Sequence, residues 1–244
     1  MAGDHFSGHA ADYAKFRPGY PPALFDWLAA QTPGHDLAWD CGCGNGQASV
    51  PLAERYRRVA ATDFSAEQVA QATPHPRIDY RASPAESSGL PAQCADLVTI
   101  AQALHWFDFD RFYAEVRRVV KPGGAIVAWT YQLLRAEPAI DTVLADFYTH
   151  TLGPHWPPER KWVDLAYRGM PFPFDEIATP QFEIRLQWSL ADLLAYLGTW
   201  SATQRYRKAE GRDPLPALGE LLAPTWGADV REIVWPIAIK AGRV

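Results

Sequence analysis

Residues 37–47 read LAWDCGCGNGQ, so a short apolar run ends in Asp40 and glycines follow at every second position. Gly42, Gly44 and Gly46 let the backbone turn tightly and approach a bound ligand with no Cβ in the way. In an open α/β sheet such a loop lies at the carboxyl end of a strand, where cofactors bind. The segment therefore predicts a strand, a nucleotide-type site and a following helix.

On both sides of this loop the chain alternates apolar runs with amphipathic segments, as in a parallel sheet with crossover helices. Predicted strands cover residues 37–41, 58–63, 78–83, 95–101 and 124–131. Helix starts are indicated by the proline pair 21–22, by Ser65 with Gln68 three residues later, and by Asp108. The helix from Asp108 is expected to end at the Pro-Gly-Gly of residues 122–124. A doubly wound α/β sheet is the predicted fold.

The later part of the chain carries two more predicted strands, at residues 182–188 and 232–241, with helical segments at 190–209 and 215–222 between them. It is also rich in proline and tryptophan: six prolines lie between residues 154 and 180, and six of the ten tryptophans follow residue 150. This composition favours either a cap around an apolar pocket or an irregular packing layer.

Composition restricts the partners and the compartment. With 48% hydrophobic and 21% charged residues the chain is a folded protein, and its net charge of −5 with no basic run argues against nucleic acid. No apolar run approaches the roughly 20 residues of a membrane span, and the N-terminus lacks the apolar core of a secretory signal. We expect a cytoplasmic protein with no membrane partner, and the oligomeric state is left open.

Three cysteines are too few for a disulfide framework, and their odd number favours a reducing compartment. Cys41 and Cys43 lie two positions apart, but no second pair completes a four-ligand zinc set. No metal site is therefore expected.

Asp63 closes the second predicted strand, 19 residues after Gly44. At this place an acidic residue accepts hydrogen bonds from ribose hydroxyls, although a lone Asp at a strand end can also be a helix cap. The dinucleotide fingerprint G-x-G-x-x-G would need glycine at position 47, which is Gln47 here. Binding of NAD is weakened by this departure but not eliminated.

Together, several motifs resemble class I S-adenosylmethionine-dependent methyltransferases of the type 11 group, over residues 37 to 130. They are Asp40-x-Gly42-x-Gly44-x-Gly46, Asp63-Phe64-Ser65, Ala85-Glu86, Ala95-Asp96-Leu97-Val98 and the VVKPGG of residues 119–124. Three more segments resemble the subgroup that includes trans-aconitate methyltransferase: Phe6-Ser7 through Tyr13, Arg17-Pro18-x-Tyr20-Pro21, and the AQALHWFD of residues 101–108.

The resemblance implies a mostly parallel sheet of seven strands with the last one antiparallel, S-adenosyl-L-methionine as cofactor, and a small-molecule methyl acceptor. It assigns the methionine end of the cofactor to Asp40, Gly42 and Gly44, the ribose to Asp63, and the face of the adenine to Phe64.

Five further residues join the implied cofactor site. Ala85 and Glu86 are expected at the adenine edge and Gln102 beside the methionine portion. Tyr13 and Arg17 lie in an N-terminal segment that the resemblance folds over the cofactor.

On the acceptor side, His105 is the candidate catalytic residue, serving as a base if the acceptor is a hydroxyl or amine, with a structural role as the alternative. Trp106, Tyr131, Trp200 and Arg205 are the candidate substrate residues. Because Arg17 and Arg205 could pair with a carboxylate, a carboxylic acid is one possible acceptor.

We expect one methyltransferase domain over residues 1–244. Its parts are an N-terminal lid segment (1–36), a cofactor-binding core (37–132), a cap or insertion (133–180 and 189–228) and the late strands (181–188 and 232–241). Two alternatives stay open at this point: a non-catalytic protein that uses the cofactor fold for binding or as a scaffold, and an NAD-dependent oxidoreductase.

Overall fold

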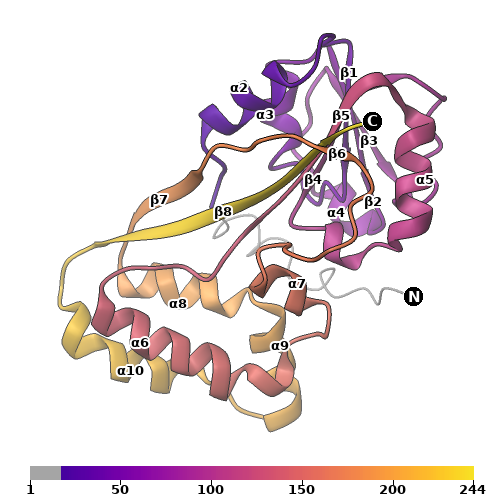
Figure 1. Cartoon of the computed structure of the whole chain (residues 1–244). Coiled ribbons are helices and arrows are strands. Elements are labelled where there is room, and N and C mark those ends of the chain that lie inside the picture. Colours follow the sequence, from indigo (N-terminus) through magenta and orange to yellow (C-terminus); the bar gives the residue numbers. More distant parts are fainter. Residues whose placement is uncertain (1–17) are drawn as a thin grey trace.

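The computed structural model describes residues 18–244, and its centre is an eight-stranded sheet in the order β3-β2-β1-β4-β5-β8-β6, with β7 also paired to β8 (Figure 1). The strands are β1 (Leu37–Cys41), β2 (Arg58–Asp63), β3 (Ile78–Ala82), β4 (Ala95–Ala101), β5 (Val120–Tyr131), β6 (Asp175–Glu176), β7 (Phe182–Trp188) and β8 (Arg231–Arg243). Strands β1 to β5 pair in parallel, whereas β8 runs antiparallel to β5. The predicted doubly wound, mostly parallel α/β sheet is confirmed.

The number of strands differs from the seven expected. The additional strand, β6, has two residues and pairs with Gly242 and Arg243 at the end of β8. Two residues carry no alternating pattern, so the sequence does not mark such a strand. Strand β8 itself runs beyond the predicted residues 232–241 because it pairs with β5 on one side and with β7 and β6 on the other.

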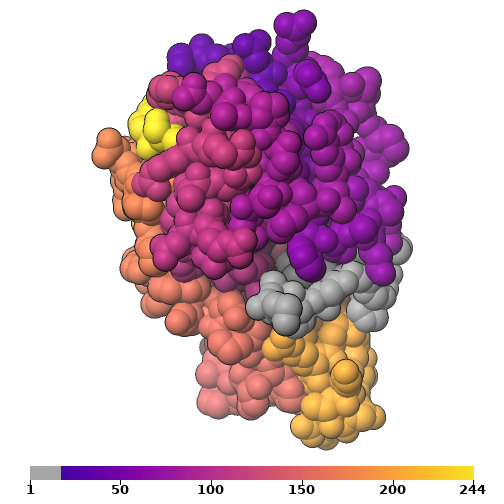
Figure 2. All heavy atoms as spheres, turned by 90° about the vertical axis from the view of Figure 1, so that its right-hand side faces the viewer, coloured from indigo at the N-terminus to yellow at the C-terminus, as the bar shows by residue number. Residues whose placement is uncertain are grey.

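Helices flank the sheet and also form a separate group at one end of it (Figure 1). Those beside the sheet are α2 (Pro22–Ala30), α3 (Ser49–Ala53), α4 (Ala66–Ala70), the 3₁₀ turn η2 (Leu104–Trp106) and α5 (Phe109–Val119). The remainder, which we call the cap helices, are α6 (Pro138–Asp146), η3 (Phe147–Thr151), η4 (Gly153–His155), α7 (Arg160–Asp164), α8 (Leu190–Gly198), α9 (Ser201–Glu210) and α10 (Leu215–Trp226). In the space-filling view the sheet and its helices form the upper part of the surface and the cap helices the lower part (Figure 2).

Local sequence signals explain several helix ends. Ser65 accepts a hydrogen bond from the backbone of Gln68, and Asp108 accepts one from the backbone of Arg111, so both predicted caps are confirmed. Helix α5 ends at Val119, however, before the Pro-Gly-Gly that was expected to end it, because β5 begins at Val120 by pairing with Ala95.

One predicted helix, at residues 190–209, is two helices in the structure. The break lies between Gly198 and Ser201, where side chains take the place of backbone donors. Thr203 Oγ1 donates to the carbonyl of Leu197 at 2.8 Å, and Gln204 Nε2 donates to that of Gly198 at 2.6 Å. These bonds satisfy the last carbonyls of α8, so the helix can end there without a glycine cap.

The sheet separates two hydrophobic cores, and alternation along the strands sends neighbouring residues to opposite cores. Ala38 packs in the core that contains α2 and much of the cap, whereas Trp39 packs against α5 in the other. Within residues 18–244 no helix combines the length and the apolar character needed to cross a bilayer.

Candidate active site

The glycine loop is fastened to the end of β2 by backbone hydrogen bonds. The N–H groups of Gly42 and Cys43 both donate to the carbonyl of Thr62, at 2.8 and 3.0 Å. Asp63 holds the next turn with both carboxylate oxygens, accepting from the N–H of Gly44 and of Ser65 at 2.8 Å each. Asp63 therefore combines the turn-capping role with its predicted position at the mouth of the loop.

Each glycine of the loop has a positive φ, but their surroundings differ. A Cβ on Gly42 would lie 2.5 Å from the Cβ of Ala103, and one on Gly46 would overlap the ring of Tyr80. A Cβ on Gly44 would meet only the side-chain oxygen of Gln68, at 3.9 Å. The first and third glycines are thus required by the protein's own packing, whereas Gly44 leaves a space that a side chain would fill.

Asp40 is fully buried beneath the loop. Its carboxylate accepts hydrogen bonds from Ser49 Oγ at 2.6 Å and from Thr99 Oγ1 at 3.1 Å. Burial raises the pKa of Asp40 to about 6, and the two hydroxyl donors only partly oppose this rise. A buried carboxylate with so few partners is suited to a positively charged ligand group.

The predicted adenine side is formed by Phe64, Ala85 and Glu86. Phe64 keeps 67% of its surface exposed although it follows a buried strand, which leaves its ring free to cover a flat ligand. Ala85 is buried, and Glu86 accepts a hydrogen bond from the N–H of Asp108 at 3.0 Å. Glu86 thus ties this segment to the start of α5.

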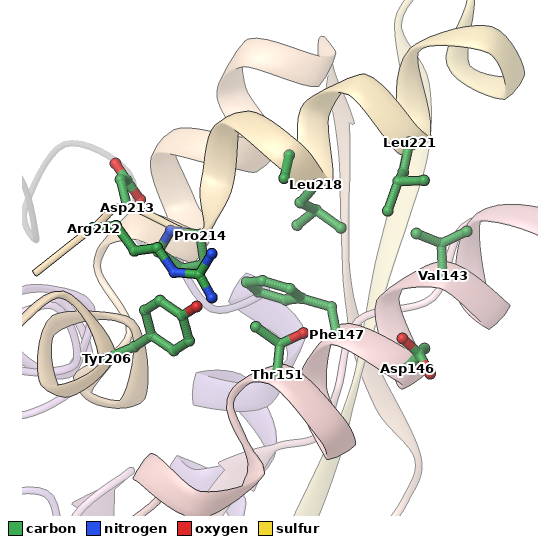
Figure 3. A pocket seen from close by; sticks show the side chains of 11 residues that line it. Val143, Asp146, Phe147, Thr151, Tyr206, Arg212, Asp213, Pro214, Leu218 and Leu221 are labelled. Carbon is green, nitrogen blue, oxygen red and sulfur yellow. The ribbon is translucent and has the colours of Figure 1, made fainter. Parts of the chain in front are cut away.

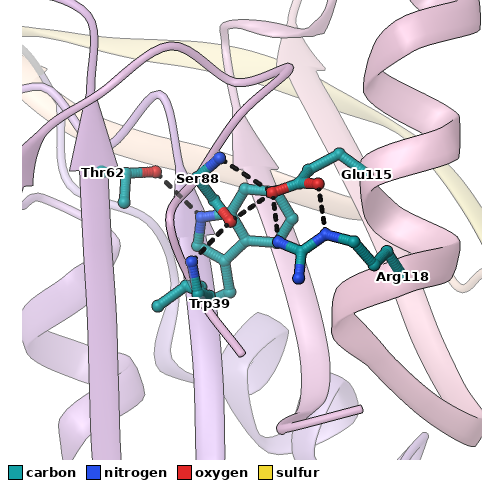
Figure 4. Close-up of polar contacts among 6 residues, drawn as sticks. Trp39, Thr62, Ser88, Glu115 and Arg118 are labelled. Atoms are coloured by element: carbon teal, nitrogen blue, oxygen red, sulfur yellow. Dashed lines mark hydrogen bonds and ion pairs between the residues drawn. The ribbon is translucent and has the colours of Figure 1, made fainter. Parts of the chain in front are cut away.

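Buried Glu115, paired with the exposed Arg118, braces the segment after Glu86 (Figure 4). Glu115 accepts from the N–H and the hydroxyl of Ser88 at 2.8 and 2.6 Å, and it forms an ion pair with Arg118 at 2.7 Å. These partners hold the pKa of Glu115 at about 2. These contacts attach to α5 the loop that carries the predicted adenine contacts. They join residues of the protein to one another and do not depend on a ligand.

Gln102, at the end of β4, is held in an unusual conformation. Its φ is +60°, its N–H donates to the carbonyl of Trp129 at 2.9 Å, and its side-chain oxygen accepts from Thr130 Oγ1 at 2.8 Å. Its side-chain nitrogen is buried, and residues 18–244 provide no hydrogen-bond acceptor for it. A strained residue with an unsatisfied donor indicates a place where a ligand completes the site.

His105 follows Gln102 by three residues and is also buried. Its Nδ1 is hydrogen-bonded to the hydroxyl of Tyr167, at 3.2 Å. Burial, reinforced by the positive charge of Arg160, lowers the pKa of His105 to about 3. The imidazole is therefore neutral at physiological pH and takes up a proton poorly.

Tyr167 reaches His105 from the segment after α7. It and Ala166 have φ of +59° and +53°, which places two successive non-glycine residues in the left-handed region. Burial raises the pKa of Tyr167 above its usual range, and a hydrogen bond with Thr130 opposes this rise. A polar chain thus runs from Gln102 through Thr130 and Tyr167 to His105.

The remaining predicted substrate residues are distributed as follows. Trp106 lies beside His105, with ring centroids 4.9 Å apart and the ring planes tilted by 43°, whereas Tyr131 is buried in the core on the α2 side. Trp200 is buried at the start of α9, and Arg205 is half-buried in the same helix. Tyr13 and Arg17 lie outside the described residues.

A separate pocket of about 240 Å³ opens among the cap helices (Figure 3). It lies between α6 with η3 and the start of α10, and Phe147, Leu218 and Arg212 are among its lining residues. No lining residue comes from the carboxyl ends of β1, β2 or β4, so this pocket is distinct from the site built by the glycine loop.

Within residues 18–244, no group of three or more His, Cys, Asp or Glu side chains is placed to hold a metal ion.

The eight-stranded sheet with a glycine loop after β1 and an acid at the end of β2 defines the class I, Rossmann-like methyltransferase fold. The family model described as a methyltransferase domain of type 11 matches residues 39–128. A Dictyostelium discoideum protein described as a methyltransferase is 33% identical over 223 residues, covering 90% of this chain and 85% of that protein.

A solved structure, described as a type II methyltransferase from Anaeromyxobacter dehalogenans, has 48% identity and a TM-score of 0.88, covering 93% of this chain and 98% of that one. An uncharacterised methyltransferase of Mycobacterium tuberculosis is 34% identical over 122 residues, about half of either chain (50% and 49%). The chain belongs to the class I S-adenosylmethionine-dependent methyltransferases. This membership replaces the two alternatives of a non-catalytic scaffold and an NAD-dependent oxidoreductase.

The residues around the glycine loop fit S-adenosylmethionine. The cofactor carries positive charge and no phosphate, which suits the buried carboxylate of Asp40 and requires no basic clamp. The space at Gly44 and the unsatisfied donor of Gln102 both lie where a bound ligand would complete the packing and the hydrogen bonding.

Several residues of the site were missed from the sequence. Ser49 and Thr99 hold Asp40, Tyr167 holds His105, and Arg160 places a positive charge near it. The proline-rich and tryptophan-rich character of residues 154–180 was the only signal that this region approaches the site.

Proposed function

We propose that the chain methylates a small organic acid on a carboxylate oxygen, in a site between the carboxyl ends of β4 and β5 and the cap helices. The observation that carries this proposal is the burial of His105 next to the positive charge of Arg160. The surroundings of the candidate base favour negative charge in the acceptor and disfavour uptake of a proton.

When bound, S-adenosylmethionine supplies a methyl group on a sulfonium, so the acceptor oxygen forms the bond to the methyl carbon while the carbon–sulfur bond breaks and leaves its electron pair on sulfur. Asp40 would hold the positively charged end, with Ser49 and Thr99 fixing the carboxylate from behind. Asp63 would bind the ribose hydroxyls, and Phe64 would cover the adenine.

A carboxylate is already ionised at neutral pH, so its methylation moves no proton. A hydroxyl or amine acceptor would need a base with a pKa near the working pH, and His105, with its pKa lowered to about 3, is poorly suited to that task. We therefore assign His105 the part of a neutral hydrogen-bonding residue that is positioned by Tyr167. In this proposal His105 donates or accepts a hydrogen bond and does not act as the general base expected from the sequence.

The cap helices complete the enclosure. Trp106 beside His105 and Trp200 at the start of α9 would form apolar walls, while Tyr131 and Arg205 would border the site from β5 and α9. Excluding water strengthens the electrostatic contacts within such a site and leaves alignment of acceptor and methyl as the enzyme's main task. Residues 133–180 and 189–228 would thus act as a cap within a single domain.

A methyl-transfer screen tests this proposal. The purified chain is incubated with S-adenosylmethionine labelled in the methyl group and with three panels: small carboxylic acids, primary amines and phenols. We expect labelled product from one or more acids, and no product with the Gly44→Val variant, whose side chain would occupy the space at the loop. Transfer to amines or phenols alone would reject the acidic acceptor while leaving the methyltransferase assignment intact.

A further inference from the structure

Arg160, at the start of α7, is held in place by aromatic rings of the cap. Its Nε donates to the hydroxyl of Tyr148 at 2.8 Å, and its guanidinium lies 4.5 Å from the centre of the Trp156 ring and 5.5 Å from that of Tyr148. The side chain is only 22% exposed. Stacking and hydrogen bonding together fix the plane of the guanidinium, which reduces the entropy lost when it binds a further group.

Most of the N–H donors of this guanidinium have no hydrogen-bond acceptor within residues 18–244. Arginine has five N–H groups in a planar fork, and the described contacts of Arg160 use only Nε, which faces Tyr148 and lies 3.5 Å from a carboxylate oxygen of Asp164. Within residues 18–244 neither Nη1 nor Nη2 has a hydrogen-bond partner. The geometry is that of a fork whose outer pair of nitrogens is available to a planar anion.

The position of Arg160 relates this fork to the proposed acceptor site. Helix α7, which begins at Arg160, packs against η2, the turn after β4 that contains His105. The positive charge of Arg160 acts to lower the pKa of both His105 and Tyr167, as this neighbourhood implies. Tyr167 comes from the segment directly after α7 and is turned inward by two successive left-handed residues. The hydrogen bond from this segment to His105 and the packing of α7 on η2 both place Arg160 on the side of the carboxyl end of β4.

Aromatic side chains surround the same place. Tyr148, Trp156 and Trp200, which we call the cap cluster, contact one another with ring centroids 4.8 to 5.8 Å apart. Trp200 is one of the four substrate residues predicted from the sequence, and the structure joins it to a charge that the sequence did not single out. Rings beside one fixed cation suit an acid whose carbon skeleton is small and apolar or planar.

We propose that Arg160 binds the carboxylate of the methyl acceptor, with Tyr148 and Trp156 holding its guanidinium and the cap cluster enclosing the carbon skeleton. This inference rests on the acidic acceptor of the proposed function and names the residue that selects for it. Arg160 is thus a specificity-determining residue supplied by the cap.

The test compares Arg160→Gln and Arg160→Lys with the wild type and with Arg207→Gln. Arg207 is a matched control because it is also a cap arginine, but its guanidinium is paired with Asp213 at 2.8 Å. The probes are small mono-, di- and tricarboxylic acids and their amides. Binding to protein saturated with S-adenosylhomocysteine is followed by tryptophan fluorescence, and KM and kcat are measured with the acids that are methylated.

We expect Arg160→Gln to raise both the Kd and the KM of the acid about tenfold or more, the effect of losing a charged hydrogen-bonding pair. The Kd and KM of Arg160→Lys should lie between those of the wild type and of Arg160→Gln, because lysine keeps the charge but lacks the planar fork of donors. Arg207→Gln should stay within about twofold of the wild type, and all three variants should bind S-adenosylmethionine with unchanged affinity. Circular dichroism and melting curves verify that each variant is folded.

Two results would overturn this inference alone: an acid bound and methylated equally well by Arg160→Gln, or an amide bound as tightly as its acid. If Arg160→Gln does not fold, an Arg160→Lys variant with unchanged Kd and KM for the acid has the same meaning. A wild-type protein that binds S-adenosylmethionine but neither binds nor methylates any of the acids would overturn the proposed function together with the inference.

Discussion

Replacing Gly42 by alanine tests whether the glycine loop is shaped by the protein's own packing. The new Cβ would lie 2.5 Å from the Cβ of Ala103. Carbon atoms in ordinary contact are about 3.5–4.0 Å apart, so the two backbones would have to separate by more than about 1 Å. Neither methyl group can rotate away, because both are attached directly to the backbone.

Two costs add up at this position. Overpacking of a filled site costs about 1–3 kcal/mol. A φ of +72° costs a residue with a Cβ about another 1–2 kcal/mol. The expected loss in the free energy of unfolding is therefore about 2–5 kcal/mol, a large share of the stability of a single domain.

Urea denaturation measures this loss, and two further variants separate its parts. Gly89 has nearly the same φ, +71°, but nothing within 4 Å of a built Cβ, so Gly89→Ala isolates the backbone cost of about 1–2 kcal/mol. Adding Ala103→Gly to Gly42→Ala removes the overlapping methyl and should restore about 1–3 kcal/mol relative to the sum of the single changes. If Gly42→Ala costs no more than Gly89→Ala, or if Ala103→Gly gives no rescue, contact with Ala103 is not what requires glycine at position 42.

Three other predictions concern ligand binding and pH. Asp63→Ala should weaken S-adenosylmethionine binding about tenfold to hundredfold, from losing a charge-assisted bond, and calorimetry with an unchanged Kd in a folded variant would remove Asp63 from the site. Because the pKa of Asp40 is raised to about 6, protonation below that pH should weaken cofactor binding, and Asp40→Asn should abolish this pH dependence in titrations at pH 5 and 8. His105, with a folded pKa of about 3 and an unfolded value near 6.5, contributes stability that is fully present above pH 6.5 and is lost toward pH 3 as the unfolded chain takes up the proton. His105→Gln should reduce the slope of unfolding free energy against pH by about 1.4 kcal/mol per unit between pH 4 and 6, and an unchanged slope would show that His105 is not buried neutral.

The central sheet could be predicted because its strands are short apolar runs with turn residues between them. Residues 95–101 are buried almost throughout, and such a run has few alternatives to a central strand. The helix break at Thr199 and Trp200 was missed because it depends on side chains that bond back to the carbonyls of α8. Propensity alone favours one continuous helix there.

The candidate site also contains residues that could be predicted from the sequence and residues that could not. Asp40 lies one residue before the end of β1 and Asp63 is the last residue of β2, so their place at the carboxyl edge follows from the local pattern. The contact between His105 and Tyr167 joins residues 62 positions apart. It depends on left-handed backbone at Ala166 and Tyr167, a conformation that alanine and tyrosine do not indicate in a sequence. Arg160 approaches this pair from the same part of the cap, and only the proline- and tryptophan-rich composition of residues 154–180 indicated that this part borders the site.

The chemistry of the product shows whether the methyl group is transferred to a carboxylate. A methyl group transferred to a carboxylate is an ester, which mild alkali hydrolyses to volatile methanol, whereas a methyl group on nitrogen, on carbon or on a phenol oxygen stays attached. The measurement is the fraction of label from the methyl-labelled cofactor that becomes volatile after alkali, using the acceptor found in the screen. If the acceptor atom is a carboxylate oxygen, nearly all of the transferred label is released as methanol. Label that stays in the product after alkali would show that the methyl group was transferred to another kind of atom.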